Sequence, residues 1–322
     1  MNGHETPMVY YYNMLTLLAV IHTDETNEAS FTCTDERGME FSYQGSLLKV
    51  RDITKMINEL YDHYKSLTMS QIFFGEPIPN FLSLLVDVCG IIDNLQNTQP
   101  RYSFIDDPQN PFHTYRMAYG EWLLSDSVRA SCFAYIHNDR LIWKLQASIE
   151  LLKQMEEICL ILLLLCIFST GPSSHTTEVA RQLLRNLPGS SRNLYILFHI
   201  LCLVDIQNKT SHKRLRNKYV PHCPALNVAD LLVYNLAIIR PFEEYLVQSI
   251  LGAKVGLRYH HQLWPGLKEA ITDTWISDAI GPECSRHLLS SSTIYNWESG
   301  RENRRKQSCG TYNNIWTLAC AT

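Results

Sequence analysis

An 11-residue apolar run, "ICLILLLLCIF" at Ile158–Phe168, most constrains the fold of this 322-residue chain. A membrane-spanning helix needs about 20 consecutive apolar residues, and the run supplies roughly half of them. Glu156 and Glu157 stand directly before it. A helix that is apolar on every face must be covered on every face by other segments. The run therefore predicts a buried helix in the core of a folded protein, with no membrane partner.

The overall charge and the cysteines exclude several classes of protein. The net charge is −4, so any attraction to nucleic acid must come from a local patch. The ten cysteines form no CxxC and no paired Cys/His spacing, so no structural metal is expected. The N-terminal "MNGHETPMVYYYNML" lacks a basic region ahead of its apolar stretch, so it does not predict a signal peptide. These features favour free thiols in a reducing, intracellular compartment.

The rest of the chain predicts a mainly α fold with a small antiparallel β-meander. Residues 22–46 are polar and indicate a loop or hairpin, and no internal repeat is present. Helical periodicity predicts helices at 47–67, 81–95, about 114–137, 139–168, 176–186, 227–239, after Pro241 and at 267–280. Short apolar runs predict three strands, at Leu194–Phe198, Leu201–Ile206 and Leu215–Val220.

Motifs for nucleotide-driven and hydrolytic chemistry are missing from the sequence. GxxxxGK[ST] does not occur, so no bound nucleotide and no helicase or ATPase motor is expected. GxSxG, HExxH and the protein-kinase motifs are also absent. No cofactor is predicted.

The densest positive charge lies in "NKTSHKRLRNKY", Asn208–Tyr219, which contains no acidic residue. On a β-hairpin, several of these side chains could point one way and contact phosphates. The alternative interpretation is a solvated hairpin tip. The candidate DNA-binding residues are Lys209, Lys213, Arg214, Arg216 and Lys218.

Three further polar features allow a simpler explanation. Asp106 and Asp107 fall in a Pro- and Asn-rich loop, where turn chemistry explains them. His260 and His261 are adjacent and should point apart, so they do not predict a metal site. His175 lies in "STGPSSHTTEVARQLLRN" at an expected helix start, where backbone N–H groups can bind an anion.

Between residues 40 and 250 the sequence contains, in order, "YQGSLLKVRDITKMINELY", "IFFGEPIPNF", "YSFIDDPQNPF", "LIWKLQ", "LLLLCIFSTGPSSHTTEVARQLLRN", "SSRNLYILF", "HKRLRNKYVP" and "ADLLVYNLAIIRPFEEYL". In this order and spacing, the stretches resemble the region ahead of the helicase module in fungal RecQ-like helicase-related proteins, which are often subtelomeric or linked to mobile elements. That region is in turn similar to tyrosine recombinases. The resemblance implies a two-part architecture, with a helical, core-binding-like domain at 1–145 and a recombinase-catalytic-like domain at 146–285. The regular pattern is lost after residue 285, so a poorly ordered tail is expected at 286–322.

The resemblance also implies positions for catalytic residues. A helix-start arginine clamps the scissile phosphate, a lysine between two strands protonates the leaving oxygen, and a later Arg-His pair adds charge. A tyrosine then attacks phosphorus. On this chain, these positions fall on His175, Lys209, Arg286, His287 and Tyr312, with Tyr295 as the other candidate nucleophile.

The histidine at position 175 departs from the family pattern. Arginine stays charged and offers two phosphate contacts, whereas histidine is mostly neutral at pH 7. The sequence therefore predicts a nuclear, non-catalytic DNA-binding protein. The alternatives left open are a protein-interaction or passenger protein, for example within a fungal biosynthetic gene cluster, and an active tyrosine recombinase.

Overall fold

The computed structural model describes residues 31–33, 40–43, 46–78, 88–170, 176–207, 218–269, 271–272, 274–276 and 278–280. The chain forms two compact units. One comprises Met1–Glu59, Gly171–His175 and Ser277–Thr322, and the other comprises Leu60–Thr170 and Thr176–Ile276. The second unit includes residues on both sides of position 145, where the sequence places a domain boundary.

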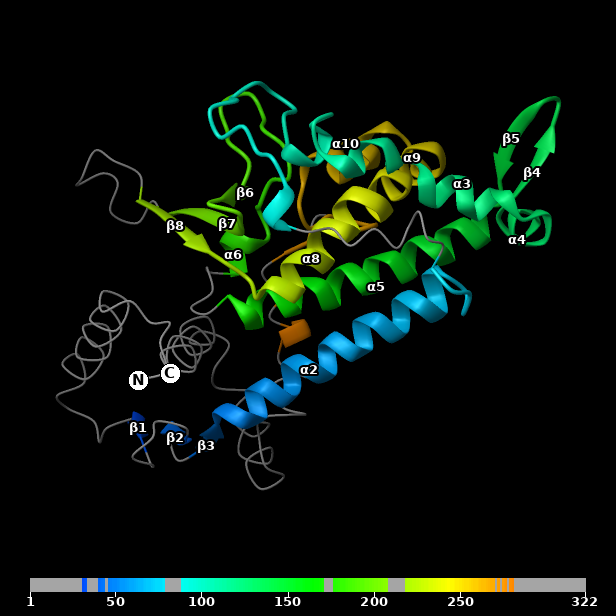
Figure 1. Cartoon of the computed structure of the whole chain (residues 1–322). Helices are drawn as coiled ribbons and strands as arrows, with labels where there is room; N and C mark the ends of the chain where they lie inside the picture. Colours follow the sequence, from blue (N-terminus) through cyan, green and yellow to red (C-terminus); the bar gives the residue numbers. More distant parts are fainter. Residues whose placement is uncertain are drawn as a thin grey trace. The chain divides into compact units, whose positions relative to one another are not determined.

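The described chain is mainly helical and carries small antiparallel sheets, as the sequence predicts (Figure 1). The α-helices are α2 (Val50–Leu67), α3 (Ala118–Ser125), α4 (Ser127–Phe133), α5 (Leu145–Ser169), α6 (Thr176–Val179), α8 (Leu226–Tyr234), α9 (Arg240–Leu251) and α10 (Ala253–His261). Shorter helical turns are η1 (Thr68–Ile72), η2 (Val88–Gly90), η3 (Phe104–Asp106), η4 (Pro111–Tyr115) and η5 (Asn235–Ile239).

The described strands form three separate sheets, each antiparallel. The first sheet lies in the smaller unit and joins β1 (Phe31–Cys33), β2 (Glu40–Tyr43) and β3 (Ser46–Lys49) in sequence order. The second is a hairpin of β4 (Ala134–His137) and β5 (Arg140–Trp143). The third is the predicted meander, made of β6 (Leu194–Leu197), β7 (Ile200–Gln207) and β8 (Lys218–His222).

Helix α5 lies in the core of the larger unit and confirms the prediction from the apolar run. Every residue from Ile161 to Phe168 is buried, so the last two turns are covered on all sides. Helices α8 and α9 pack along it, and η1 contacts it too (Figure 1). Among the described helices, none combines the length and the apolar character needed to cross a bilayer.

The helical stretch from α8 to α9 is continuous but changes its hydrogen-bonding pattern at η5, a π-helical turn. Pro241 occupies the first turn of α9. A proline within a helix has no N–H to donate, and its ring clashes with the carbonyl four residues earlier, here that of Ala237. The π-helical turn loosens the backbone around that carbonyl. All five η5 residues are buried.

The hairpin β4–β5 corrects the prediction of helices at 114–137 and 139–168. Helices α3 and α4 occupy only part of the first range, and α5 begins at Leu145. Asn138 and Asp139 connect the strands with φ angles of 49° and 58°. Two consecutive positive φ angles define the hairpin turn that best matches strand twist, and Asn and Asp tolerate it well.

Two other predicted helices are shorter than expected. Helix α6 ends at Val179, although the periodicity extends to Asn186. The backbone beyond it bonds to distant segments instead: Leu184 N–H donates to His261 O at 2.8 Å, and Leu263 N–H donates to Gln182 O at 3.0 Å. In the predicted helix at 81–95, the described part contains only the short η2, followed by an irregular segment. For 267–280, the described residues are helical at 274–276 and 278–280.

Candidate functional site

Most of the sequence-predicted site residues lie outside the described residues. These are His175, Lys209, Lys213, Arg214, Arg216, Arg286, His287, Tyr295 and Tyr312. Lys218 is the first residue of β8, where its backbone pairs with that of Gln207. The structure does describe the sheet of β6, β7 and β8, whose last two strands lie directly before and after these basic residues in the sequence.

We call residues 208–218 the basic segment. Strand β7 ends at Gln207, directly before the segment, and β8 begins at Lys218, its last residue. The two strands pair antiparallel from Leu203↔His222 to Gln207↔Lys218. Since directly opposed Cα atoms lie roughly 5 Å apart, the chain leaves and rejoins the sheet at neighbouring points. Strand β7 thus confirms the strand predicted at Leu201–Ile206, and β8 agrees with the strand predicted at Leu215–Val220 over Lys218–Val220.

A buried polar cluster anchors the central strand of this sheet. Asp205 on β7 accepts a 3.0 Å hydrogen bond from Gln182 Nε2, and Gln182 Oε1 accepts one of 2.9 Å from the Trp264 indole. His222 Nε2 on β8 lies 3.6 Å from the other Asp205 oxygen. Burial raises the pKa of Asp205, although the bond from Gln182 and the charge of His222 oppose this. The cluster fixes β7 and β8 against the segments that carry Gln182 and Trp264.

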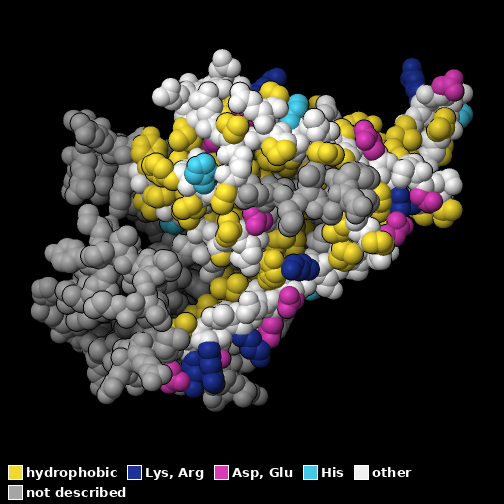
Figure 2. All heavy atoms as spheres, viewed as in Figure 1, with side chains coloured by type: hydrophobic (Ala, Val, Ile, Leu, Met, Phe, Trp, Pro, Cys, Tyr) yellow, Lys and Arg dark blue, Asp and Glu magenta, His cyan; other side chains and the backbone are white. Residues whose placement is uncertain are grey.

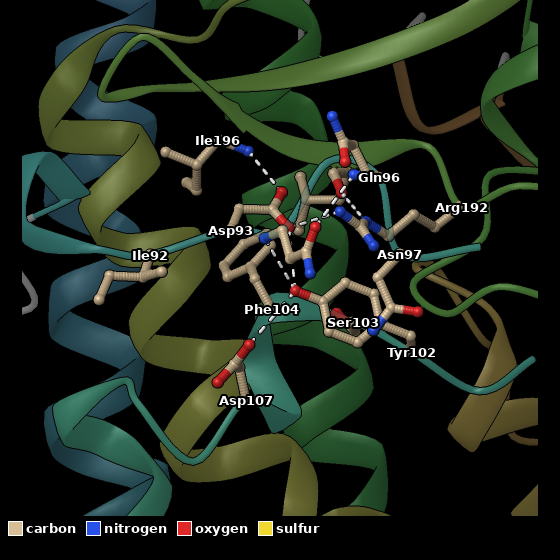
Figure 3. Close-up of polar contacts among 12 residues, drawn as sticks. Ile92, Asp93, Gln96, Asn97, Tyr102, Ser103, Phe104, Asp107, Arg192 and Ile196 are labelled. Carbon is tan, nitrogen blue, oxygen red and sulfur yellow. Dashed lines mark hydrogen bonds and ion pairs between the residues drawn. The ribbon is translucent and has the colours of Figure 1, made fainter. Parts of the chain in front are cut away.

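A second anchor joins the start of the sheet to the loop after η2 (Figure 3). Arg192 Nη2 lies 2.5 Å from Asp93 Oδ1, and both side chains are almost fully buried. The second Asp93 oxygen accepts a 3.1 Å bond from the backbone N–H of Ile196 on β6. The Arg192 guanidinium also lies 4.7 Å and 4.5 Å from the ring centres of Tyr102 and Tyr195. This geometry holds the arginine between an acid and two aromatic faces.

Tyr102 and Asn186 extend this second anchor. Figure 3 shows the Tyr102 hydroxyl between Asp93 and Asp107, at 3.4 Å and 3.3 Å from their nearest oxygens. Burial raises the pKa of Tyr102, so the hydroxyl keeps its proton and can donate it to one of the two carboxylates. The Asn186 side chain accepts from Arg192 N–H at 3.0 Å and donates to Asn97 O at 3.0 Å.

A third anchor centres on Arg185. Its Nε and Nη2 donate to the two Asp106 oxygens at 2.6 Å and 3.0 Å, and Nη1 donates to His260 O. Arg116 donates to Asp106 as well. Burial opposes ionisation of Asp106, but the hydrogen bonds and charges of the two arginines outweigh it and lower the pKa of that carboxyl. The guanidinium of Arg185 therefore forms a bidentate ion pair with Asp106 inside the protein.

The Arg185 anchor corrects two predictions about loop residues. Turn chemistry explains Asp107, which accepts from Gln109 N–H at 3.0 Å, but Asp106 is an ion-pair partner. The rings of His260 and His261 do not point apart; they meet edge to face at 4.9 Å. His260 Nδ1 also lies 2.7 Å from the Glu244 carboxylate.

The Asp106 pair makes stability depend on pH. Because the pKa of Asp106 is lower in the folded than in the unfolded chain, its stabilising contribution is present above about pH 4. That contribution is lost as the pH falls through the folded-state pKa. Asp106→Asn is expected to destabilise the protein at pH 7, with the difference from the wild type narrowing toward pH 3, as measured by urea unfolding at both values. Asp107→Asn is the control, and an equal loss at both pH values for Asp106→Asn would contradict the assignment.

The buried arginines have a common consequence for function. Arg185, Arg192 and Arg240 each face a carboxylate, with Arg240 Nε 2.9 Å from Glu243 Oε2. None of these three is exposed, so they stabilise the fold and do not reach a phosphate. On the face seen in Figure 2, Lys and Arg side chains of the described residues lie singly or in small groups, with Asp and Glu among them.

The sequence missed these anchors because their partners are far apart in the chain. Arg192 and Asp93 are separated by 99 positions, and Arg185 and Asp106 by 79. The only local signal is an acid or arginine beside apolar residues, as at Ile91-Ile92-Asp93. Within the described ranges, no group of three or more His, Cys, Asp or Glu side chains is arranged to hold a metal ion.

Comparison with models of known protein families, with characterised proteins and with solved structures gave no match.

Proposed function

We propose that this chain is a nuclear protein that binds duplex DNA through the basic segment and does not catalyse recombination. The observation that carries the proposal is the position of the segment between two paired strands, β7 and β8. Five cations and no acid occur within these 11 residues. The pairing of Gln207 with Lys218 keeps the two ends of the segment together.

The anchors described above support this proposal in a second way. A phosphate contact requires that a cation be held without being neutralised by the protein's own acids. The buried arginines are neutralised internally, and the Arg192–Asp93 pair also holds the first strand of the sheet that contains β7 and β8. The three buried arginines are therefore not assigned to the DNA contact, and in a chain with a net charge of −4 the basic segment supplies the densest positive charge.

The relation to fungal recombinase-helicase proteins remains part of the proposal. The resemblance requires a lysine between two strands, and Lys209 falls between β7 and β8. The absence of catalysis follows from the histidine at position 175, because a neutral imidazole stabilises the negative charge of the transition state less than a guanidinium.

DNA binding is tested by fluorescence anisotropy on a mixed-sequence duplex, titrated from low to physiological salt. The wild type is expected to bind with an affinity that falls steeply with salt. Replacing Lys213, Arg214 and Arg216 together by alanine should weaken binding and lower the log–log salt slope by about 2–3, since each lost phosphate contact lowers it by about 0.9. The matched control removes three exposed cations elsewhere: Arg140, Lys153 and Lys254.

The outcomes of this titration separate the competing functions. An equal loss in the test and control variants would mean that binding follows total charge, and the basic segment would lose its role. No binding by the wild type at low salt would overturn the proposal and favour a protein-interaction or passenger role.

Catalysis is tested by trapping a covalent protein–DNA adduct on nicked or suicide duplexes. No adduct is expected from the wild type. An adduct that disappears with Tyr312→Phe or Tyr295→Phe would instead identify an active tyrosine recombinase.

A further inference from the structure

Two cysteine thiols meet across the β7–β8 hairpin at the end remote from the basic segment. Cys202 lies on β7, and Cys223 directly follows β8. The pairing of Leu203 with His222 makes these cysteines the next opposed positions along the hairpin. Their sulfur atoms are 2.8 Å apart. Cys202 is buried, whereas Cys223 is exposed to solvent.

This geometry needs little change to form a disulfide. The S–S bond is about 2.05 Å long, so closure requires less than about 1 Å of sulfur movement. Cys202 is on β7 and Cys223 directly follows β8, and the pairing of these strands already holds the two backbones side by side. A bond between them would close residues 202–223 into a covalent loop that includes the basic segment.

The two thiols differ in pKa and in exposure to solvent, as the two members of a reactive pair should. The thiolate is the nucleophile, and its reactivity depends on a low pKa and on access. The hydrogen bond from the Cys202 thiol lowers the pKa of Cys223 to about 7. The same contact and burial raise the pKa of Cys202, which stays protonated. Cys223 is thus suited to react with an oxidant from solvent, and the buried Cys202 thiol is positioned to react with Cys223 afterwards.

Three other described cysteines, Cys132, Cys159 and Cys166, lack this combination. Cys159 and Cys166 are buried on α5, and burial raises the pKa of both thiols. Cys132 is exposed on α4, where its thiol donates to Val128 O at 3.4 Å. It therefore serves as an exposed comparison for Cys223.

We propose that Cys202 and Cys223 form a peroxide-reactive pair that closes to a reversible disulfide. The Cys223 thiolate attacks one oxygen of hydrogen peroxide, the O–O bond breaks, and a sulfenic acid and hydroxide form. The Cys202 sulfur then attacks the Cys223 sulfur, the S–O bond breaks, and water leaves with the Cys202 proton. The peroxide gains the two electrons that the thiols lose, and a dithiol reductant restores both. This inference does not depend on DNA binding.

The test treats the reduced full chain with about one equivalent of hydrogen peroxide, blocks remaining thiols and digests with trypsin without reductant. The tryptic peptides 193–209 and 219–254 contain Cys202 and Cys223, respectively, and no other cysteine. Mass spectrometry is expected to find these two peptides linked, with the loss of two hydrogen atoms, and separated by dithiothreitol. The rate should rise with pH around about 7, as the Cys223 thiolate fraction increases.

Serine variants assign the roles of the two sulfurs. Cys223→Ser should abolish peroxide consumption by the pair, whereas Cys202→Ser should leave a Cys223 sulfenic acid that dimedone labels. Cys132→Ser should behave as the wild type, and far-UV circular dichroism checks the fold of each variant. Absence of the linked peptide, linkage of Cys223 to another cysteine, or equal dimedone labelling of Cys132 would each overturn the proposal.

Discussion

Asp93→Ala is expected to lower the free energy of unfolding by about 3–5 kcal/mol, because it leaves the Arg192 guanidinium buried without its counter-charge. The Arg192 and Asp93 side chains are 1% and 0% exposed, so water cannot solvate the guanidinium in place of the lost carboxylate. The substitution also leaves the N–H of Ile196 without its acceptor. Urea unfolding monitored by circular dichroism measures the change.

A paired substitution separates the cost of an orphaned charge from the net value of the ion pair. Asp93→Leu combined with Arg192→Met replaces both charges by apolar groups of similar size, and it should regain most of the stability that either single change loses. If the double variant is as unstable as the sum of the two single variants, the two side chains do not interact in solution and the anchor is wrongly assigned.

Leu162→Ala is expected to destabilise the protein by about 2–5 kcal/mol, because it leaves a cavity in the core where the Leu162 side chain of α5 was packed. Leu162 is fully buried, at 0% exposure. The same substitution at Leu145, on the first turn of the same helix and 59% exposed, provides the matched control. Its effect should stay within about 0.5 kcal/mol. Thermal or urea unfolding of the two variants compares them directly.

Equal losses for the two α5 variants would contradict the placement of the apolar run. They would mean that the first and last parts of the helix are covered to the same extent. A loss confined to Leu162→Ala would support the description of a helix exposed at its start and enclosed toward its end.

The parts of the fold that the sequence predicted are those with local signals. The buried helix α5 follows from the apolar run at Ile158–Phe168, and the meander follows from short apolar runs near Leu194, Leu201 and Val220. Helix α6 shows the limit of periodicity, since hydrogen bonds to the segment after α10 replace the expected helical turns. The hairpin at Asn138-Asp139 was missed because alternation over four-residue strands is short enough to be taken for helix.

In the candidate site too, the features with a local sequence signal were predicted, and those that depend on distant contacts were not. The basic segment is visible in sequence because its cations are contiguous, and the strand predicted before it is confirmed, the one after it in part. The partners of Arg185 and Arg192 are brought close only by folding, because they lie 79 and 99 positions away, respectively. No local pattern around either arginine predicts which acid it pairs with. The opposed thiols of Cys202 and Cys223 likewise depend on strand register, which residue spacing alone does not give.

The enclosure of α5 also sets an order of events during synthesis. Its apolar face is covered by α8 and α9, and Leu251 at the end of α9 is made 82 residues after Ser169. At about 5–20 residues per second, translation takes roughly 4–16 s to supply that cover. During this interval the emerging chain exposes the apolar surface of α5 to solvent. Chains shortened before α8 would keep that surface open permanently and should aggregate on expression.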